Sequence, residues 1–346
     1  MKNKNFFKIN LIYFVAITLV AIIFVLGYLG ILQNEILTSF LIQIVVMFAI
    51  PMLMYSLLTK KRLKETLTDA GLKKVTTNTI IISIGLGFTL YFINTFVADT
   101  FSSIIAMFGY ENISSGTSQT TVTYGTLLKE LILSCVLPGF CEEFLHRGIM
   151  LHANKKYSNP KFCLIISSLL FGLVHLNIRQ FFYAAILGFL MGYTTLVADS
   201  IIPSIIAHFM NNFLSTYFFY GSQFKWPLAS FVAEIREYFY GNIMIFMISS
   251  TLCVVLLFLA YIKLTKLLQK ERLKKEIHLI IKETQMEKLT MEEAQIKFEE
   301  INQLLKLNAL NQNNQNKSTF FDKIFLISSI VLGVLITISS FIWGVI

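Results

Sequence analysis

The sequence predicts an all-α protein, a polytopic membrane bundle of about eight or nine transmembrane helices. Of its 346 residues, 55% are hydrophobic and 14% are charged, whereas ordinary soluble domains carry about 25% charged residues. Apolar runs of roughly 18 residues or more recur along the chain, and a helix of that length crosses a hydrocarbon layer of about 30 Å. The composition therefore excludes a soluble globular fold.

A window of about 19 residues places about nine candidate spans along the chain. The first begins after a basic stretch, as a signal peptide does, but it is too long and lacks a small-residue cleavage site. We therefore expect it to remain as a membrane helix. The spans cover residues 6–32, 36–58, 79–93 with an extension toward 107, 125–151, 162–176, 181–197, 201–220, 243–264 and 321–345.

Lysine and arginine residues decide the predicted orientation. The net charge is +9, and these residues gather in the loops at 59–65 and 152–161 and in the segment after the eighth span. All three lie on one side of the predicted topology, which the positive-inside rule makes the cytoplasmic side. We therefore expect a multi-pass integral protein of the plasma membrane with a cytoplasmic amino terminus. Because topology accounts for the basic charge, the expected partner is the lipid bilayer and not nucleic acid.

We divide the chain into three units. Residues 1–262 form the membrane bundle, with its core at about 123–220, and residues 319–346 add a C-terminal transmembrane helix. Between them, residues 263–318 carry charges of both signs and apolar residues at helical spacing, with TMEE as a capping box. This pattern predicts a cytoplasmic helical hairpin with a polar linker, and self-association through the hairpin is an expected interaction.

Several small or polar residues in the spans have a structural interpretation. Gly188 and Gly192 form a GxxxG pattern, which lets a neighbouring helix approach closely. Other side chains are expected to form hydrogen bonds between helices or to lie at the membrane interface. They are His146, His152, Arg179 and Asp199.

A small set of ionisable residues in the spans calls for a functional explanation. A charged side chain at the bilayer centre costs at least about 2.5 to 3.5 kcal/mol, so such groups usually face a cavity or one another. Glu143 and Arg147 are four residues apart, which lets them pair on one helix face. Glu142 points about 100° away from that pair and is left to act as a general base toward water.

Two other predicted spans carry histidines. His208 and Asn212 are four residues apart in one of them, and His175 lies near the end of another. Counted from the basic loops, Glu142 and His175 both lie about 20 Å from the same side of the membrane. His208 lies only about 11 Å deep, so a tilted or shortened helix must bring it to the others. We expect Glu142, His175 and His208 to share one wet pocket.

Other chemistries fit the sequence poorly. The HExxH motif is absent, and the Glu-x-x-His at Glu143 and His146 lacks the second pair that a di-iron bundle needs. No GxSxG is present. An ion-coupled transporter would show interrupted helices at matching positions of two halves, and the flanking patterns here do not match. Glu142, His175, His208 and Asn212 would together supply a base that activates water and donors that stabilise an oxyanion. These are the minimum groups that amide hydrolysis needs.

Three motifs carry a resemblance to a known family. EEFLHR, FGLVH and HFMNN, in this order on separate predicted helices, match the patterns EExxxR, FxxxH and HxxxN. Over about residues 123–220 the chain resembles the intramembrane CAAX protease and bacteriocin-processing family, which includes the type 2 CAAX prenyl endopeptidases. The resemblance implies an intramembrane endopeptidase acting on a CAAX-type, prenylated or peptide-precursor substrate. The implied partner is thus a lipidated or apolar-tailed peptide.

The resemblance also implies roles for the motif residues. Glu142 activates the attacking water beside His175, while His208 and Asn212 steady the oxyanion and the second glutamate braces the helix with its arginine. The family is often labelled metalloproteases, because Glu142, His175 and His208 could ligate zinc. We favour the metal-free glutamate mechanism, since His208 with Asn212 reads as a pair of donors. A catalytically silent immunity protein on the same fold stays open, because every motif position is filled.

Overall fold

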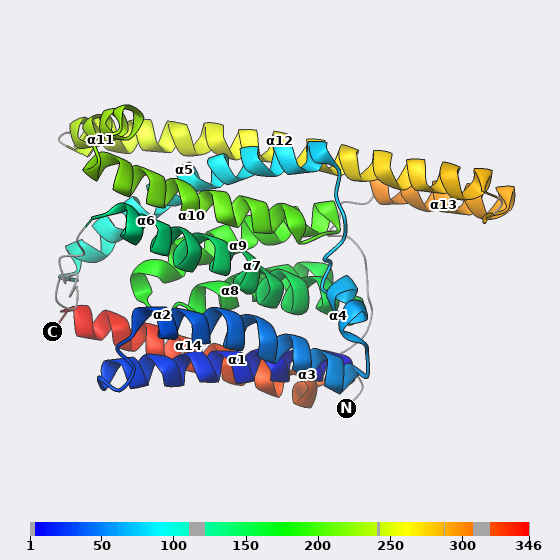
Figure 1. The fold of residues 1–346 in the computed structure, drawn as a ribbon, viewed down its shortest axis with the longest axis horizontal. Coiled ribbons are helices and arrows are strands. Elements are labelled where there is room, and N and C mark those ends of the chain that lie inside the picture. Colours follow the sequence, from blue (N-terminus) through cyan, green and yellow to red (C-terminus); the bar gives the residue numbers. More distant parts are fainter. Residues whose placement is uncertain (1–3, 111–121, 241–242, 287, 307–318, 346) are drawn as a thin grey trace.

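The computed structural model describes residues 4–110, 122–240, 243–286, 288–306 and 319–345. Within these ranges nearly all residues are helical and none lies in a strand. The predicted all-α class is confirmed, and the long helices run side by side along one direction, as the helices of a membrane bundle do (Figure 1).

Helices from both ends of the chain form the lower part of the bundle in Figure 1. α1 and α14 pack along each other, and Asn10 Nδ2 donates to the main-chain oxygen of Asp322 at 3.5 Å. The elements of this part are α1 (Lys4–Tyr28), α2 (Glu35–Phe40), the π-helical η1 (Leu41–Ala49), α3 (Ile50–Thr59) and α14 (Phe320–Val345).

The central segment of the chain forms the rest of the bundle. A continuous helix from Tyr124 to Lys156 lies in the middle with α8 (Pro160–Leu173) and α9 (Ile178–Ala198). Above them in Figure 1 lie α5 (Thr77–Met107), α10 (Ile202–Gln223), α11 (Pro227–Tyr240) and α12 (Ile243–Gln285). The remaining helices are α4 (Leu63–Asp69) and α13 (Met291–Lys306).

The helix from Tyr124 to Lys156 is α-helical only in part. Rare π-helical turns, which occur often at functional sites, flank its central portion on both sides. Both glutamates of the first motif lie at the end of that central α-helix, where the helix changes from α to π. Its parts are α6 (Tyr124–Glu130), the π-helical η2 (Leu131–Val136), α7 (Leu137–Glu143), the π-helical η3 (Phe144–Ala153) and the 3₁₀ turn η4 (Asn154–Lys156).

Each of the nine predicted spans contains a helix, but the helices are not equivalent. In the described part of the chain, 7 are long and apolar enough to cross a membrane. α8 has 14 residues, which is about 21 Å and short of a full crossing. α10 has 22 residues but is too polar to count as a span. These two helices carry the second and third motifs.

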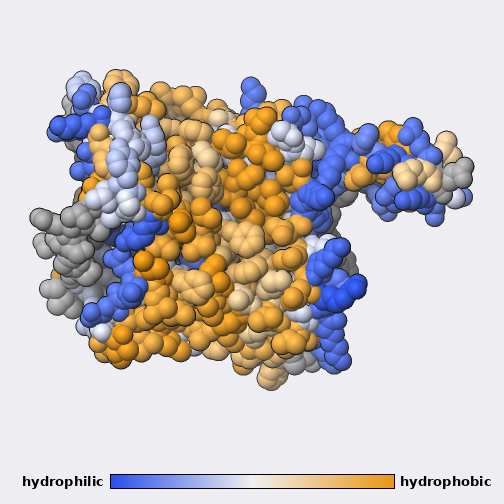
Figure 2. Space-filling view, in the orientation of Figure 1, coloured by the Kyte–Doolittle hydropathy of each residue, from blue (hydrophilic) through white to orange (hydrophobic). Residues whose placement is uncertain are grey.

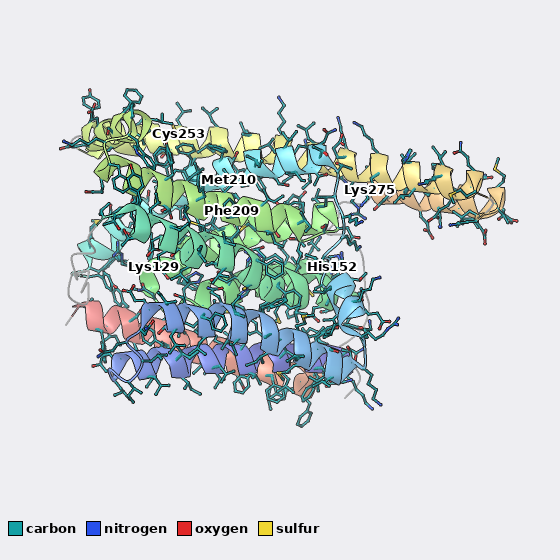
Figure 3. All side chains as sticks on the ribbon, viewed as in Figure 1. Lys129, His152, Phe209, Met210, Cys253 and Lys275 are labelled. Atoms are coloured by element: carbon teal, nitrogen blue, oxygen red, sulfur yellow. The ribbon has the colours of Figure 1, made fainter. Side chains whose placement is uncertain are left out.

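The two ends of the bundle differ in charge. A wide apolar band runs around the visible face, with hydrophilic residues at both ends (Figure 2). The amino terminus, α4 and α13 lie at one end and the carboxyl terminus at the other (Figure 1). His152 and Lys275 lie at the first end, whereas Lys129 and Cys253 lie toward the second (Figure 3). The lysine-rich loops therefore share one end, which we call the basic end.

The predicted helical hairpin is present. α12 has 43 residues and continues without a break from the membrane segment past the basic end, where α13 packs back along it (Figure 1). Ile280, Ala294 and Ile301 are buried between the two helices. The apolar residues that marked this segment in the sequence therefore pack within the hairpin.

Glycines let neighbouring helices approach closely. A Cβ atom built on Gly188 would lie 3.1 Å from Ser168 Cα, and one on Gly192 would lie 2.6 Å from Leu164 Cδ1. The GxxxG pattern therefore packs α9 against α8, as the sequence predicted.

The contact between α5 and α10 depends on another glycine. A Cβ atom on Gly87 would lie 2.3 Å from Met210 Cβ and 3.0 Å from the main-chain oxygen of Ala207. We expect Gly87→Ala to lower the stability by about 1 to 3 kcal/mol through overpacking. Thermal unfolding in detergent measures this loss as a lower melting temperature.

Gly85 provides the matched control on the same helix. A Cβ atom there would meet only side-chain carbons of Leu264, at 3.7 Å. Gly85→Ala adds helix propensity of up to about 1 kcal/mol, so its melting temperature should be unchanged or higher. An equal loss in both variants would contradict the close packing of α5 on α10.

Asp199 organises the basic end from the turn between α9 and α10. Its Oδ1 lies 2.9 Å from His152 Nε2 and accepts from Lys155 Nζ at 2.5 Å. It also pairs with Lys73, which precedes α5. Burial alone would raise the pKa of Asp199, but the hydrogen bond from His152 and the nearby lysines overcome it and hold the pKa well below its usual range.

Asp69 forms a second centre beside it. Tyr55 Oη donates to its carboxylate at 2.9 Å and Lys156 Nζ at 2.6 Å, and Lys61 pairs with it as well. His152 Nδ1 donates to the main-chain oxygen of Asp69 at 2.8 Å. One imidazole thus links both centres, and together they fix the loop between α3 and α5 onto the ends of η3 and α9.

We expect Asp199→Asn to cost about 3 kcal/mol or more, because it leaves buried cations without their carboxylate. Since the folded pKa of Asp199 lies below its ordinary value of about 3.9, its stabilisation is present above about pH 4 and fades as the pH falls toward the folded pKa. Melting temperatures of both proteins between pH 3 and about pH 8 measure this difference, which should be constant above about pH 5 and shrink below about pH 4.

Glu65→Gln is the control for this measurement. Glu65 pairs with Arg62 on the surface of the same end, with side-chain exposures of 45% and 88%. Such exposed pairs contribute about 1 kcal/mol or less. If both variants lost the same stability, the ion pairs of Asp199 would not hold this end together.

Candidate active site

Phe171 of α8 lies at the centre of a cluster of polar side chains. Its ring centroid is 5.0 Å from that of His146, 5.2 Å from His175 and 5.8 Å from His208, each approached edge-on. Arg147 Cζ lies 4.1 Å above the same ring, a cation–π contact. The FxxxH phenylalanine thus brings together residues from η3, α10 and the end of α8.

Glu143 is a fully buried member of the cluster. Its side chain is 0% exposed, and its Oε1 accepts from Arg147 Nη1 at 2.7 Å. The same oxygen lies 2.9 Å from His208 Nδ1. The expected pair of Glu143 with Arg147 therefore forms, and the carboxylate also connects α7 to α10.

Glu142, the adjacent glutamate, has a different environment. Its Oε1 accepts from Gln43 Nε2 at 2.8 Å, and no cation contacts it within the described ranges. Gln43 belongs to the π-helical η1 and is itself 8% exposed. Gln43 was not among the site residues predicted from the sequence, although an amide inside the apolar run LIQIVV is itself unusual in a membrane span.

His175 lies just beyond α8, in the tight connection to α9. α8 ends at Leu173, and Leu176 takes a left-handed conformation with φ 53°. His175 Nδ1 donates to the main-chain oxygen of Phe171 at 2.7 Å. The first turn of α9 is held by α14, where Ser340 Oγ accepts from the backbone N–H of Ile178 at 2.9 Å.

The partners of the two motif histidines determine their tautomers. The partner of Nδ1 is a carbonyl oxygen in His175 and a carboxylate oxygen in His208. Both partners only accept, so each Nδ1 carries the hydrogen and each Nε2 keeps a free lone pair when the ring is neutral. Each motif histidine can therefore accept one further hydrogen bond through Nε2.

His146 is structural, as the sequence predicted. It is 0% exposed, and its Nδ1 donates to the main-chain oxygen of Glu142 at 2.9 Å. Its Nε2 lies 3.4 Å from Tyr13 Oη, which donates to the main-chain oxygen of Leu170 at 2.8 Å. The ring therefore joins α1 to the end of α7.

Asn212 belongs to a chain of amides one turn along α10 from His208. Its Nδ2 donates to the main-chain oxygen of Ser134 at 2.8 Å. Its Oδ1 accepts from Asn211 Nδ2 at 2.8 Å, and Asn94 Nδ2 reaches Asn211 Oδ1 at 3.4 Å. One hydrogen of the Asn212 amide is left for another acceptor.

Zinc was the alternative to a metal-free mechanism. Where the structure describes the chain, no three His, Cys, Asp or Glu side chains lie close enough together to hold a metal ion. His208 is held by Glu143, and Glu142 by Gln43. The proposed ligand set of Glu142, His175 and His208 does not fit zinc in this arrangement, so we assign no step to a metal.

A large cavity lies between α5, α9, α10, α11 and α12. Its volume is about 1090 Å³, which is ample for a peptide segment with an apolar chain. Aromatic and aliphatic side chains such as Phe218 and Leu256 line it together with polar ones such as Asn94 and Arg179. The wall is therefore amphipathic.

No motif residue lines this cavity, but its wall begins close to the second motif. Asn177, on the wall, follows His175 by two positions and caps α9. The cavity therefore lies near the connection between α8 and α9, where His175 is placed.

Fold and site together define the class, a polytopic integral membrane protein with acids and imidazoles from separate helices gathered inside the bundle. The comparison with protein families identifies it further. Residues 124–214 match the family Type II CAAX prenyl endopeptidase Rce1-like, and all three motifs lie within this range. This part of the chain is therefore similar to the CAAX protease family. No curated protein and no solved structure matches the chain.

We expect Arg147→Met to destabilise the protein by about 3 to 5 kcal/mol, because it leaves the Glu143 carboxylate buried without its cation. Arg147→Lys should lose less stability, because lysine keeps the positive charge although it lacks the paired N–H donors of the guanidinium. Arg62→Met is the control, because Arg62 is 88% exposed in its pair. Melting in detergent compares all three, and equal losses for Arg147→Met and Arg62→Met would contradict a buried pair.

Proposed function

We propose that this protein is an intramembrane endopeptidase that hydrolyses a peptide bond with water activated by Glu142. The contrast between two adjacent glutamates carries the proposal. The Glu143 carboxylate contacts an arginine and a histidine, whereas the Glu142 carboxylate accepts from the amide of Gln43 and pairs with no cation in the part of the chain that the structure describes. Carboxylates in such different environments take different roles, one structural and one catalytic.

In the proposed reaction, the free oxygen of Glu142 accepts a proton from water as the water oxygen bonds to the peptide carbonyl carbon. Nε2 of His175 accepts the second hydrogen of the water and orients it. When the carbonyl re-forms, the carbon–nitrogen bond breaks and Glu142 returns the proton to the leaving nitrogen. The proton thus passes from the water oxygen to the carboxylate and then to the leaving nitrogen, and the hydrolysis balances without another reactant.

The oxyanion needs donors, and α10 supplies two candidates. Asn212 has one amide hydrogen beyond the one bonded to Ser134. The Glu143 carboxylate accepts from Nδ1 of His208, and a second ring hydrogen at Nε2 would make that nitrogen a donor as well. We therefore assign oxyanion stabilisation to Asn212 and His208.

The amphipathic cavity supports a membrane-associated substrate. An apolar tail fits against Phe218 and Leu256, while Asn94 and Arg179 offer polar contacts to a peptide. We propose a CAAX-type substrate, either a prenylated tail or a peptide precursor with an apolar end. By the positive-inside rule the basic end faces the cytoplasm of a plasma-membrane protein.

Self-association through the α12–α13 hairpin is a separate part of the proposal. Leu279, Ile281 and Ile296 remain 45%, 44% and 52% exposed on the hairpin. Exposed apolar residues on a helical pair can bury one another between two copies.

Cleavage of a farnesylated CAAX peptide and of an unlipidated apolar peptide by purified protein tests the activity, with mass spectrometry of the products. We expect Glu142→Gln and His175→Ala each to reduce the rate by a factor of about 10² to 10⁴, the usual contribution of a general base. Glu130→Gln, in the same membrane helix, should cleave at the normal rate.

All variants must keep the melting temperature of the natural protein for this comparison. Cleavage by Glu142→Gln at the full rate would remove the mechanism. Activity that disappears with EDTA and returns with zinc would reject the metal-free version. A folded protein that cleaves neither peptide would favour the silent immunity protein.

A further inference from the structure

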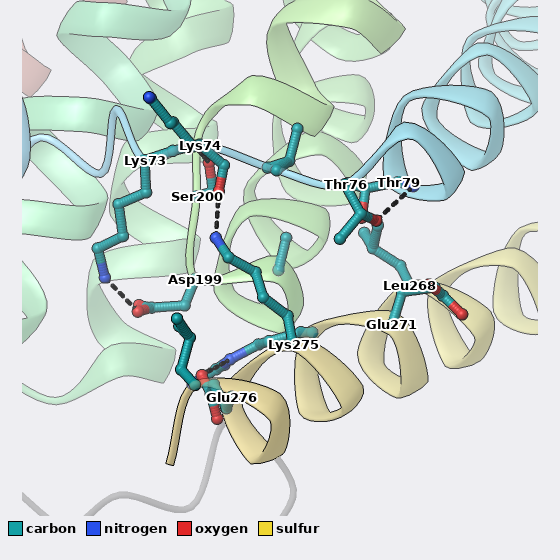
Figure 4. A pocket seen from close by; sticks show the side chains of 14 residues that line it. Lys73, Lys74, Thr76, Thr79, Asp199, Ser200, Leu268, Glu271, Lys275 and Glu276 are labelled. Carbon is teal, nitrogen blue, oxygen red and sulfur yellow. Dashed lines mark hydrogen bonds and ion pairs between the residues drawn. The ribbon is translucent and has the colours of Figure 1, made fainter. Parts of the chain in front are cut away.

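A small cleft at the basic end has no role in the proposed reaction. It lies where the segment before α5, the turn between α9 and α10, and α12 meet (Figure 4). Its volume is about 220 Å³, below the range of about 300 to 1,000 Å³ typical of sites for drug-sized ligands. The charged side chains that line it include Lys73, Asp199, Arg272, Lys275 and Glu276.

The acids around the cleft are already paired. Asp199 contacts both Lys73 and Lys155. Glu276 accepts from Arg272 Nε at 2.8 Å. Glu271, which also lines the cleft, accepts from Lys274 Nζ at 2.8 Å. No carboxylate that lines the cleft is therefore left without a cation.

Lys275 is a cation without such a partner. It reaches across the cleft from α12, and its ammonium donates to the main-chain oxygen of Lys74 (Figure 4). Where the chain is described, no acid contacts Lys275, and the exposed ammonium of Lys74 has no acid partner either. The cleft therefore keeps a positive charge and ammonium hydrogens that an anion can accept.

The depth of the cleft indicates the source of the anion. α5 begins at Thr77 and α9 ends at Ala198, so the cleft lies where membrane spans begin and end. Leu268 and Leu279 line it alongside the charged residues. Phospholipid phosphates lie at this level, and basic pockets between helices on the cytoplasmic side bind anionic head groups.

We propose that this cleft binds the phosphate group of an anionic phospholipid, with Lys275 as its principal contact. The head group would bridge α12 and the segment before α5, next to the point where the hairpin leaves the bundle. Arg272 stabilises the shape of the cleft, because its Nη1 donates to the main-chain oxygen of Val197 at 3.3 Å and holds α12 against the end of α9. This site is independent of the proposed protease activity.

Native mass spectrometry of the full-length protein in detergent, titrated with phosphatidylglycerol or phosphatidylcholine, tests the proposal. Phosphatidylglycerol should bind in preference to phosphatidylcholine. Lys275→Gln should weaken binding of phosphatidylglycerol about fivefold, and adding Lys74→Gln should weaken it by about the same factor again. Lys275→Arg keeps the charge and should bind as the natural protein does.

Lys270→Gln is the matched control, because Lys270 is exposed on the same helix and does not line the cleft. It should change binding by less than about twofold. If Lys275→Gln proves unstable, the binding of Lys74→Gln is compared with that of the control instead. Equal binding of both lipids, or equal effects of Lys275→Gln and Lys270→Gln, would overturn the proposal. Stabilisation by inorganic phosphate but not by phosphatidylglycerol would overturn the assignment to a lipid.

Discussion

One buried carboxylate connects the parts of the site. Glu143 is fully buried, and a single oxygen of its side chain meets both Arg147 and His208. An ion inside a membrane bundle is stable only when its partners are in place. The position of α10 relative to α7 is therefore coupled to the charge of Arg147. Phe171 completes the arrangement, because its ring contacts the arginine and the histidines at once.

Two of the three motifs lie on or directly after the two least membrane-like helices. α8 is too short to cross the apolar layer and α10 is too polar, and longer or more apolar helices surround them. A short helix can end inside the bundle when its exposed backbone groups find partners there. α14 provides one such partner through Ser340, at the start of α9. The C-terminal helix thus supports the connection that places His175, as well as packing on α1.

Much of the site followed from the sequence by spacing alone. The pair of Glu143 with Arg147 forms as four-residue spacing predicted, and His146 is a hydrogen-bonded structural residue. His208 meets Glu143, although its position in the sequence placed it at a shallower depth than Glu142. Gln43 was missed because a lone amide in an apolar run has no spacing partner. Its contact with Glu142 joins residues 99 positions apart.

The sequence by itself determined the class of protein, the order of the helices and the three motifs, because hydrophobicity and helical periodicity are local properties of the chain. Only the tertiary structure decided that Gln43 holds Glu142 and that Glu143 also meets His208. It also decided that Asp199 and Asp69 gather lysines from distant loops into one network at the basic end. These outcomes depend on which side chains meet across helices. Helix packing and π-helical turns set that geometry, and neither can be read from a local sequence pattern.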